Sequence, residues 1–260
     1  MRTRIVGRAE PAIVLRTRPL GEADLIVVLL TVGGKVDAVA PSGRRSRKRF
    51  TGGFAPGMRG VATVAKGKGT LMRLSEFDPT SDHTPVGRDL MRFAFVAYVC
   101  ELADEFIGMD ARDPVVYTAV ESALSAIIDR PPKPAMLRRF ELQLLASLGF
   151  LSPLGGCCVC RQRVFDGEDV SGEVGFDPGR GGVLCPQHSG GLYLPAASVL
   201  HAVALAEHHE EQTAEVFAAI EAAPVDVRRG LRDLTYGLIR EHLRRPLKSL
   251  AFFAQIPREG

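Results

Sequence analysis

Three cysteines and one histidine occur as two pairs with the spacing of metal ligands. Cys157 and Cys160 form the first pair, Cys185 and His188 form the second, and 24 residues separate the pairs. Two intervening residues let both side chains of a pair turn toward one point, and thiolate and imidazole are preferred ligands of Zn²⁺. Because the chain supplies all four ligands, the pattern predicts a closed, structural zinc site and not a catalytic one.

Disulfides and a different ligand set are the alternative uses of these cysteines. Paired disulfides would require an oxidising compartment and would leave His188 without a role. Cys158 is an alternative ligand, although it departs from the two-residue spacing. Cys100 lies in an apolar helical run and is expected to be a buried thiol. The segment between the two pairs is polar and acidic, so we expect it to need the metal in order to fold.

The N-terminal part predicts a small barrel. Short runs rich in β-branched residues, punctuated by glycine-containing turns, predict strands over residues 12–18, 25–31, 36–40, 57–66 and 70–77. Five short strands in about 80 residues fit a closed barrel of the OB-fold type, whose face and loops commonly bind oligonucleotides.

Positive charge is concentrated in the same part of the chain. Residues 1–80 contain 15 Lys+Arg and 6 Asp+Glu, whereas residues 81–260 contain 18 and 24. This asymmetry indicates that the N-terminal part meets a polyanion. The connection after the third strand, residues 43–50, holds five basic residues in six.

Basic loops in a basic barrel favour contact with nucleic acid, because neutralised phosphates release counterions and an exposed ring can stack on an unpaired base. A solvated loop with no ligand is the alternative, and Phe50 and Phe54 are rings of a kind that more often belong to a core. The predicted DNA-binding residues are Lys35, Arg44, Arg45, Arg47, Lys48, Arg49, Phe50, Lys66 and Lys68.

The rest of the chain predicts helices around the cysteine segment. Residues 79–85 have the composition of a linker, and helical periodicity follows over residues 87–108, 114–128, 135–148, 195–208, 213–222 and 227–243. The fold class is therefore α+β: an OB-fold barrel at residues 1–80, a mainly helical domain at residues 81–154 and 192–260, and an inserted zinc-binding module at residues 155–191.

The sequence also bears on other functional classes. A secretory signal and a membrane-spanning apolar run are absent from the sequence, so we expect a cytoplasmic protein that does not contact membranes. A metal-dependent nuclease would need clustered carboxylates on a rigid frame, whereas Asp166, Glu168 and Asp169 lie in a polar segment. A zinc-ribbon regulator would favour a basic zinc module, and this module is acidic. No catalytic residues are assigned, and an enzyme is not expected.

The chain resembles the RecO family of bacterial recombination mediators. The resemblance is carried by residues 12–15, 21–24, 30–31 and 34–35 with the basic loop, by residues 137–150 running into Cys157 and Cys160, by residues 181–185, and by residues 244–249. It covers nearly the whole chain in order. One departure is His188, where a fourth cysteine is commoner, and zinc accepts either ligand.

The resemblance implies a DNA repair and recombination role without an enzymatic step. It implies binding of single- and double-stranded DNA, annealing of complementary strands, and a complex with RecR that helps load RecA onto strands coated by single-stranded-DNA-binding protein (SSB). It also implies that the acidic C-terminal tail of SSB docks on the helical domain. Arg138 and Arg139 are the positions that match the docking arginine, and an arginine suits a terminal carboxylate. The alternative is that both are ordinary helix arginines, with Arg138 placed to pair with Glu141.

Overall fold

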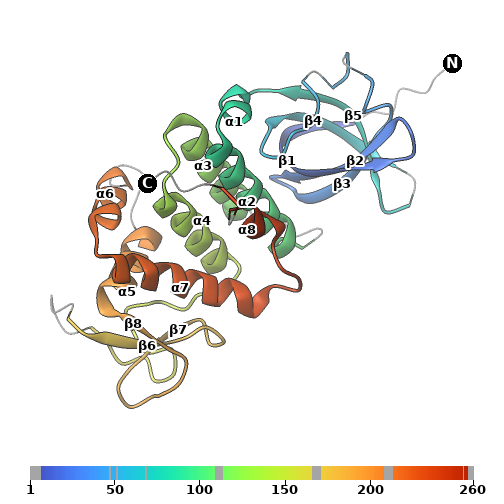
Figure 1. Ribbon diagram of the computed structural model, residues 1–260. Coiled ribbons are helices and arrows are strands. Elements are labelled where there is room, and N and C mark those ends of the chain that lie inside the picture. The colour runs from blue at the N-terminus through green and yellow to red at the C-terminus, as the bar shows by residue number, and fades with distance from the viewer. Residues whose placement is uncertain are drawn as a thin grey trace. The chain divides into compact units, whose positions relative to one another are not determined.

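A computed structural model describes residues 7–46, 48–50, 52–67, 69–108, 114–165, 171–207, 213–253 and 255–256. The predictions for Arg47, Lys68, Asp166, Glu168 and Asp169 fall outside the described residues. The chain forms two compact units, the first made of residues 1–132 with 245–260 and the second of residues 133–244 (Figure 1).

The first unit contains the predicted five-stranded barrel. Its strands are β1 (Arg8–Leu20), β2 (Asp24–Thr31), β3 (Gly34–Ala40), β4 (Arg59–Lys66) and β5 (Met72–Pro79). They close in the order β1-β2-β3-β5-β4 (Figure 1), with every pair antiparallel except β3 and β5. The barrel predicted from the alternating strands is confirmed.

Side-chain alternation along β1 explains both the barrel core and its cover. Ala12 and Val14 point into the core with residues of the other strands. Leu15 is also buried, and it lies on the opposite side beside Ala97 and Cys100 of helix α2 (Leu90–Phe106). A shift in register between Val14 and Arg16 bends the strand. One strand therefore contributes to two apolar layers.

The first unit also contains four helices: α1 (Thr84–Arg88), α2 (Leu90–Phe106), α3 (Pro114–Asp129) and α8 (Lys248–Phe253). Asp89 caps α2 by accepting hydrogen bonds from the N–H groups of Met91 and Arg92 at 2.9 and 3.0 Å. Two of these helices differ from the sequence prediction. α1 begins inside the predicted linker, and α8 lies beyond the last predicted helix, which ends at residue 243.

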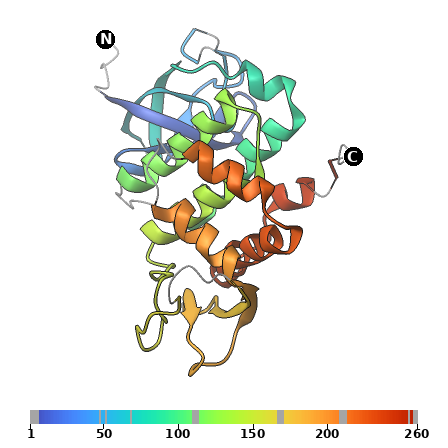
Figure 2. The same cartoon turned by 90° about the vertical axis from the view of Figure 1, so that its left-hand side faces the viewer.

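The second unit is a helical body with a small sheet. Its elements are α4 (Pro134–Ser147), β6 (Glu173–Asp177), β7 (Gly182–Leu184), β8 (Leu192–Pro195), α5 (Ala196–Glu207), α6 (Thr213–Ala222) and α7 (Val225–His242). The sheet order is β7-β6-β8. Figure 2 shows this sheet, in yellow and gold, at one end of the helices of the unit. The sheet was not anticipated from the polar sequence of the module.

The compact units divide the chain differently from the predicted boundary at residue 80. Helices α1 to α3 and α8 belong to the unit of the barrel, because the apolar side of α2 packs on β1. None of the described helices is long and apolar enough to cross a membrane.

Candidate metal centre and nucleic-acid-binding surface

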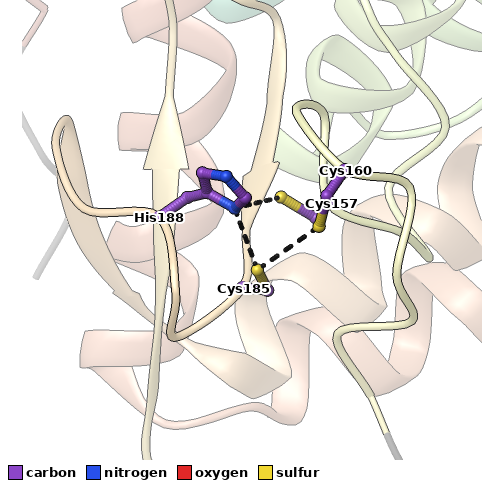
Figure 3. Close-up of side chains that lie close together, drawn as sticks. All are labelled: Cys157, Cys160, Cys185 and His188. Atoms are coloured by element: carbon purple, nitrogen blue, oxygen red, sulfur yellow. Dashed lines mark hydrogen bonds between the residues drawn. The ribbon is translucent and has the colours of Figure 1, made fainter.

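The four predicted metal ligands lie together in the second unit (Figure 3). Their donor atoms are all within 4.8 Å of one another. The Sγ atoms of Cys160 and Cys185 are 3.6 Å apart, and Nδ1 of His188 is 3.6 Å from Sγ of Cys157 and 3.2 Å from Sγ of Cys185. A disulfide needs two sulfurs at about 2.05 Å, so these sulfurs are not bonded to each other.

The spacing of the donor atoms fits a tetrahedral zinc site. With Zn–S near 2.3 Å and Zn–N near 2.05 Å, a regular tetrahedron places two sulfurs about 3.8 Å apart and a sulfur and a nitrogen about 3.6 Å apart. The observed separations of 3.2 to 3.6 Å lie close to these values. The cluster can therefore hold one metal ion with four protein ligands.

Tight turns aim each pair of ligands at the common point. The N–H of Arg161 donates to the carbonyl of Cys157 at 2.9 Å, and the N–H of His188 donates to the carbonyl of Cys185 at 2.9 Å. Arg161 takes a positive φ of 66°, which lets the chain reverse after Cys160. Backbone hydrogen bonds thus shape both of the turns that carry the ligands.

Cys158 has a different position from its neighbours. Its N–H donates to the carbonyl of Val183 at 2.8 Å, which joins the first turn to β7. A Cβ on Gly182 would lie 2.7 Å from Cβ of Cys158, so the close approach of the two segments requires glycine. Cys158 is outside the group of four donors, and its role here is to pack the turn on β7.

The cysteine environment favours thiolate at one ligand. Burial raises the pKa of the Cys157 thiol, but hydrogen bonds from the backbone of Cys160, Cys185 and Val159 outweigh this effect and lower the pKa to about 6. Burial raises the pKa of the Cys185 thiol, and the neighbouring sulfurs add to the increase. A divalent cation between the sulfurs favours the ionised form of both.

The apolar core around the ligands is small. It contains Cys157, Leu184 and Cys185, with Cys158 and Val164 packed against it. Most of this cluster consists of the cysteines themselves, so its stability depends on what their sulfur atoms bind. A bound metal supplies the interaction energy that so small a core lacks.

The second candidate site is the loop that follows β3. Arg44, Arg45 and Lys48 are exposed. The start of the loop is anchored to the turn before β2, since Arg44 donates its N–H to the carbonyl of Ala23 at 3.1 Å and the N–H of Ser42 donates to the Asp24 carboxylate at 2.8 Å. The exposed side chains of Arg44, Arg45 and Lys48 are suited to binding phosphate.

Two predicted DNA-binding residues in this loop, Phe50 and Arg49, have structural roles. Phe50 is 2% exposed and belongs to the barrel core, where its ring lies 5.0 Å from that of Phe54. Its ring offers no surface for base stacking, so its assignment as a DNA-binding residue is corrected. Arg49 donates to the carbonyl of Pro41 at 2.7 Å and to the hydroxyl of Ser46 at 3.3 Å, and it thereby holds the loop.

The assignment of Lys35 as a DNA-binding residue is also corrected. Its side chain is only 10% exposed, and its ammonium donates to the carbonyl and the carboxylate of Asp104 at 2.6 and 3.3 Å. Arg16 donates to the same carboxylate. The lysine is thus committed to an internal ion pair with α2. Lys66, at the end of β4, is exposed and remains available to a ligand.

The two arginines of α4 differ from each other. Arg138 is 15% exposed and pairs with the fully buried carboxylate of Glu141, as the three-residue spacing indicated. Its guanidinium is therefore occupied inside the unit. Arg139 is half-buried on the same helix.

The fold and site define a class of protein: a closed five-stranded barrel with exposed cations, joined in one chain to a helical unit that carries a Cys₃His cluster. Residues 8–82 match the family model described as Recombination protein O N terminal, and residues 87–251 match that described as Recombination protein O C terminal. The chain belongs to the RecO family.

The sequences of several proteins match this chain over most of its length. A protein of Anaeromyxobacter sp. (strain Fw109-5) named DNA repair protein RecO is 32% identical over 94% of each chain, and one of Anaeromyxobacter dehalogenans (strain 2CP-C) with the same name is 34% identical over 94% of each chain. A protein of that name from Symbiobacterium thermophilum is 38% identical over 67% of this chain and 68% of its own length.

Proposed function

We propose that this protein is a DNA-binding recombination mediator. It binds single- and double-stranded DNA, anneals complementary strands, and acts with RecR to help load RecA onto SSB-coated single strands, without an enzymatic step of its own. The observation that carries the proposal is the exposed cationic loop of Arg44, Arg45 and Lys48 on a small barrel in a chain of the RecO family.

The physical basis of DNA binding is electrostatic. Arginine and lysine side chains on the loop neutralise phosphates and release their counterions, which favours binding to any sequence. With Phe50 inside the barrel, no aromatic ring of the described loop residues 43–46 and 48–50 is available for stacking. Contact through this loop is therefore with the backbone and does not read the bases.

The Cys₃His cluster is assigned to a structural Zn²⁺. The ligand types and separations support zinc, and four protein ligands leave no position open for a substrate. Cys157, Cys160, Cys185 and His188 would hold the ion, whose contribution is to fix the module to the helices of the second unit.

Replacing Arg44, Arg45 and Lys48 with Gln tests the loop. We expect single-stranded DNA affinity to fall about ten- to hundredfold at low salt, and the slope of log K against log salt to shrink by about 2, because each lost phosphate contact contributes about 0.7. Arg49 is left in place, since it holds the loop. Fluorescence anisotropy at several salt concentrations measures both quantities.

The matched control removes the same charge elsewhere. Arg88, Arg130 and Lys133 are exposed and lie outside the barrel, so their replacement by Gln is expected to leave affinity and slope within about twofold and 0.5 of the original values. If both variants lose the same affinity for DNA, or if the loop variant loses none, the loop is not the DNA-binding surface.

We also propose that Arg139 contributes to docking of the acidic SSB tail. Support comes from its position in the α4 sequence that matches the family and from the chemistry of a guanidinium beside a carboxylate. For Arg139→Ala, affinity for an acidic peptide ending in Phe should fall about tenfold while DNA affinity is unchanged. Unaltered peptide affinity in that variant contradicts the assignment.

A further inference from the structure

Helix α7 presents a second cationic surface, in the unit without the barrel. Arg229, Arg232, Tyr236 and Arg240 are all exposed. At 100° per residue, these four positions fall within an arc of about 80° on the helix. The opposite side of α7 is buried, and the helix packs there against α4, α5 and β8 (Figure 1). We call the four exposed residues the α7 face.

Overall charge does not explain this surface. Residues 133–244 contain 11 Lys+Arg and 14 Asp+Glu, so the unit as a whole is slightly acidic. Arg232 pairs with Asp233 at 2.8 Å, but both side chains are well exposed, at 60% and 40%. Exposed pairs of this kind are weak, so a phosphate can replace the carboxylate. Asp226 and Asp233 border the arc on one side only.

An exposed aromatic ring lies in the middle of the α7 face. Tyr236 is 41% exposed, with Arg232 one turn before it and Arg240 one turn after it. The rise of 1.5 Å per residue spaces these three side chains by about 6 Å along the helix. Cations that flank an accessible ring match the two features of a single strand, because phosphates attract the arginines and an unpaired base stacks on tyrosine.

The backbone beneath the ring is fixed by close packing. A Cβ on Gly237 would lie 3.2 Å from Cγ of Pro178 and 3.7 Å from Cδ1 of Leu192. The turn after β6 and the start of β8 therefore lie directly against the helix at this point. Because Cys158 ties the metal-binding turn to β7 of the same sheet, the cluster supports the segment on which α7 rests.

We infer that the α7 face binds single-stranded DNA independently of the barrel loop. The inference rests on the proposed function and deepens it: strand annealing needs two strands to be held by one protein, and a second binding surface on the other unit provides for this. The described contacts give the face backbone recognition and base stacking, without sequence-specific reading.

Two sets of variants of the full-length protein test the face, with fluorescent oligo-dT as the probe. Replacing Arg229, Arg232 and Arg240 with Gln should weaken binding at least tenfold and reduce the salt slope by about 2, whereas Lys at the same positions should preserve the slope. Tyr236→Ala should weaken binding about five- to tenfold with the slope unchanged, and Tyr236→Phe should bind like the original protein.

Comparison with the barrel variant separates this inference from the proposed function. Loss in the triple Gln variant of α7 supports the face whether or not the Arg44, Arg45 and Lys48 variant also loses binding. If only the barrel variant loses DNA binding, the inference about the α7 face is wrong and the proposed function stands. If neither variant loses DNA binding, both the barrel loop and the α7 face are wrongly assigned as DNA-binding residues.

An acidic protein partner is the competing occupant. If the α7 variant keeps its DNA affinity and salt slope but loses binding to poly-glutamate, the face docks acidic protein and the inference is wrong.

Folding of the variants is checked by thermal melting and zinc content, which these exposed substitutions should leave unchanged. Photo-crosslinking of a 5-bromodeoxyuridine strand should join DNA to the α7 peptide, and a crosslink absent from α7 counts against the inference.

Discussion

Replacing Cys185 with alanine is expected to abolish zinc binding and to unfold the module at residues 155–191. Cys185 is 3% exposed and belongs to the small cluster with Cys157 and Leu184. Structural zinc contributes an apparent free energy of about 10–16 kcal/mol in zinc-finger peptides, which exceeds what so small an apolar core supplies. Loss of one ligand therefore removes the main stabilising interaction of the module.

Metal content and limited proteolysis measure this effect. We expect one zinc per chain in the original protein, close to none in the Cys185→Ala protein, and rapid cleavage within residues 155–191 of the variant. Cys158→Ala is the matched control, because Cys158 is adjacent to the site but outside the four donors, and it should keep its zinc. A Cys185→Ala protein that retains one zinc and resists the protease refutes the ligand assignment.

Replacing Asp104 with alanine is expected to destabilise the barrel unit by about 3–5 kcal/mol. The Asp104 side chain is 6% exposed and accepts hydrogen bonds from Lys35 and Arg16. Lys35 is itself 10% exposed, so the variant leaves an ammonium nearly buried without its counter-charge. Removing one member of a buried pair costs more than removing both, because the desolvated charge that remains is uncompensated.

A double variant separates lost pairing from lost packing. Lys35→Met combined with Asp104→Leu should recover most of the stability in urea unfolding followed by circular dichroism. Asp37→Ala is the control, because its pair with Arg18 at 3.9 Å is more exposed, and it should cost less than about 1 kcal/mol. An Asp104→Ala protein as stable as the Asp37→Ala protein contradicts the structural role given to the ion pair.

Much of the fold could be predicted because its signals are local. Alternating β-branched runs separated by glycine turns give the strands of the barrel, and helical periodicity gives α2 to α7 near their observed bounds. The four metal ligands form two short-range patterns, so their grouping was also predictable. In each case the residues that define the feature lie within a few positions of one another.

The wrong assignments involve contacts between distant residues. Lys35 is occupied by Asp104, which lies 69 residues further along the chain, and a count of basic residues does not show such a partner. Phe50 enters the barrel through a bridge to Phe77. Helix α8 is anchored when Glu101 accepts the N–H groups of Lys248 and Ser249 at 2.9 and 2.8 Å. No local pattern predicts any of these three contacts.

The α7 face is a different case, because its signal is local. Arg229, Arg232, Tyr236 and Arg240 follow helical spacing in the sequence. A net-charge count does not reveal this pattern, because the C-terminal part of the chain is acidic as a whole. The structure shows which side of the helix is exposed, and only then does the positive stripe separate from the acidic residues around it.

Annealing of two complementary strands, with neither ATP nor Mg²⁺ added, tests the central claim most directly. The account predicts that the purified protein accelerates duplex formation at low salt, that acceleration declines steeply as salt rises, and that both strands remain intact on a denaturing gel. A protein that fails to accelerate annealing, or that acts only with Mg²⁺ and shortens the strands, contradicts a non-enzymatic DNA-binding mediator and favours a metal-dependent nuclease.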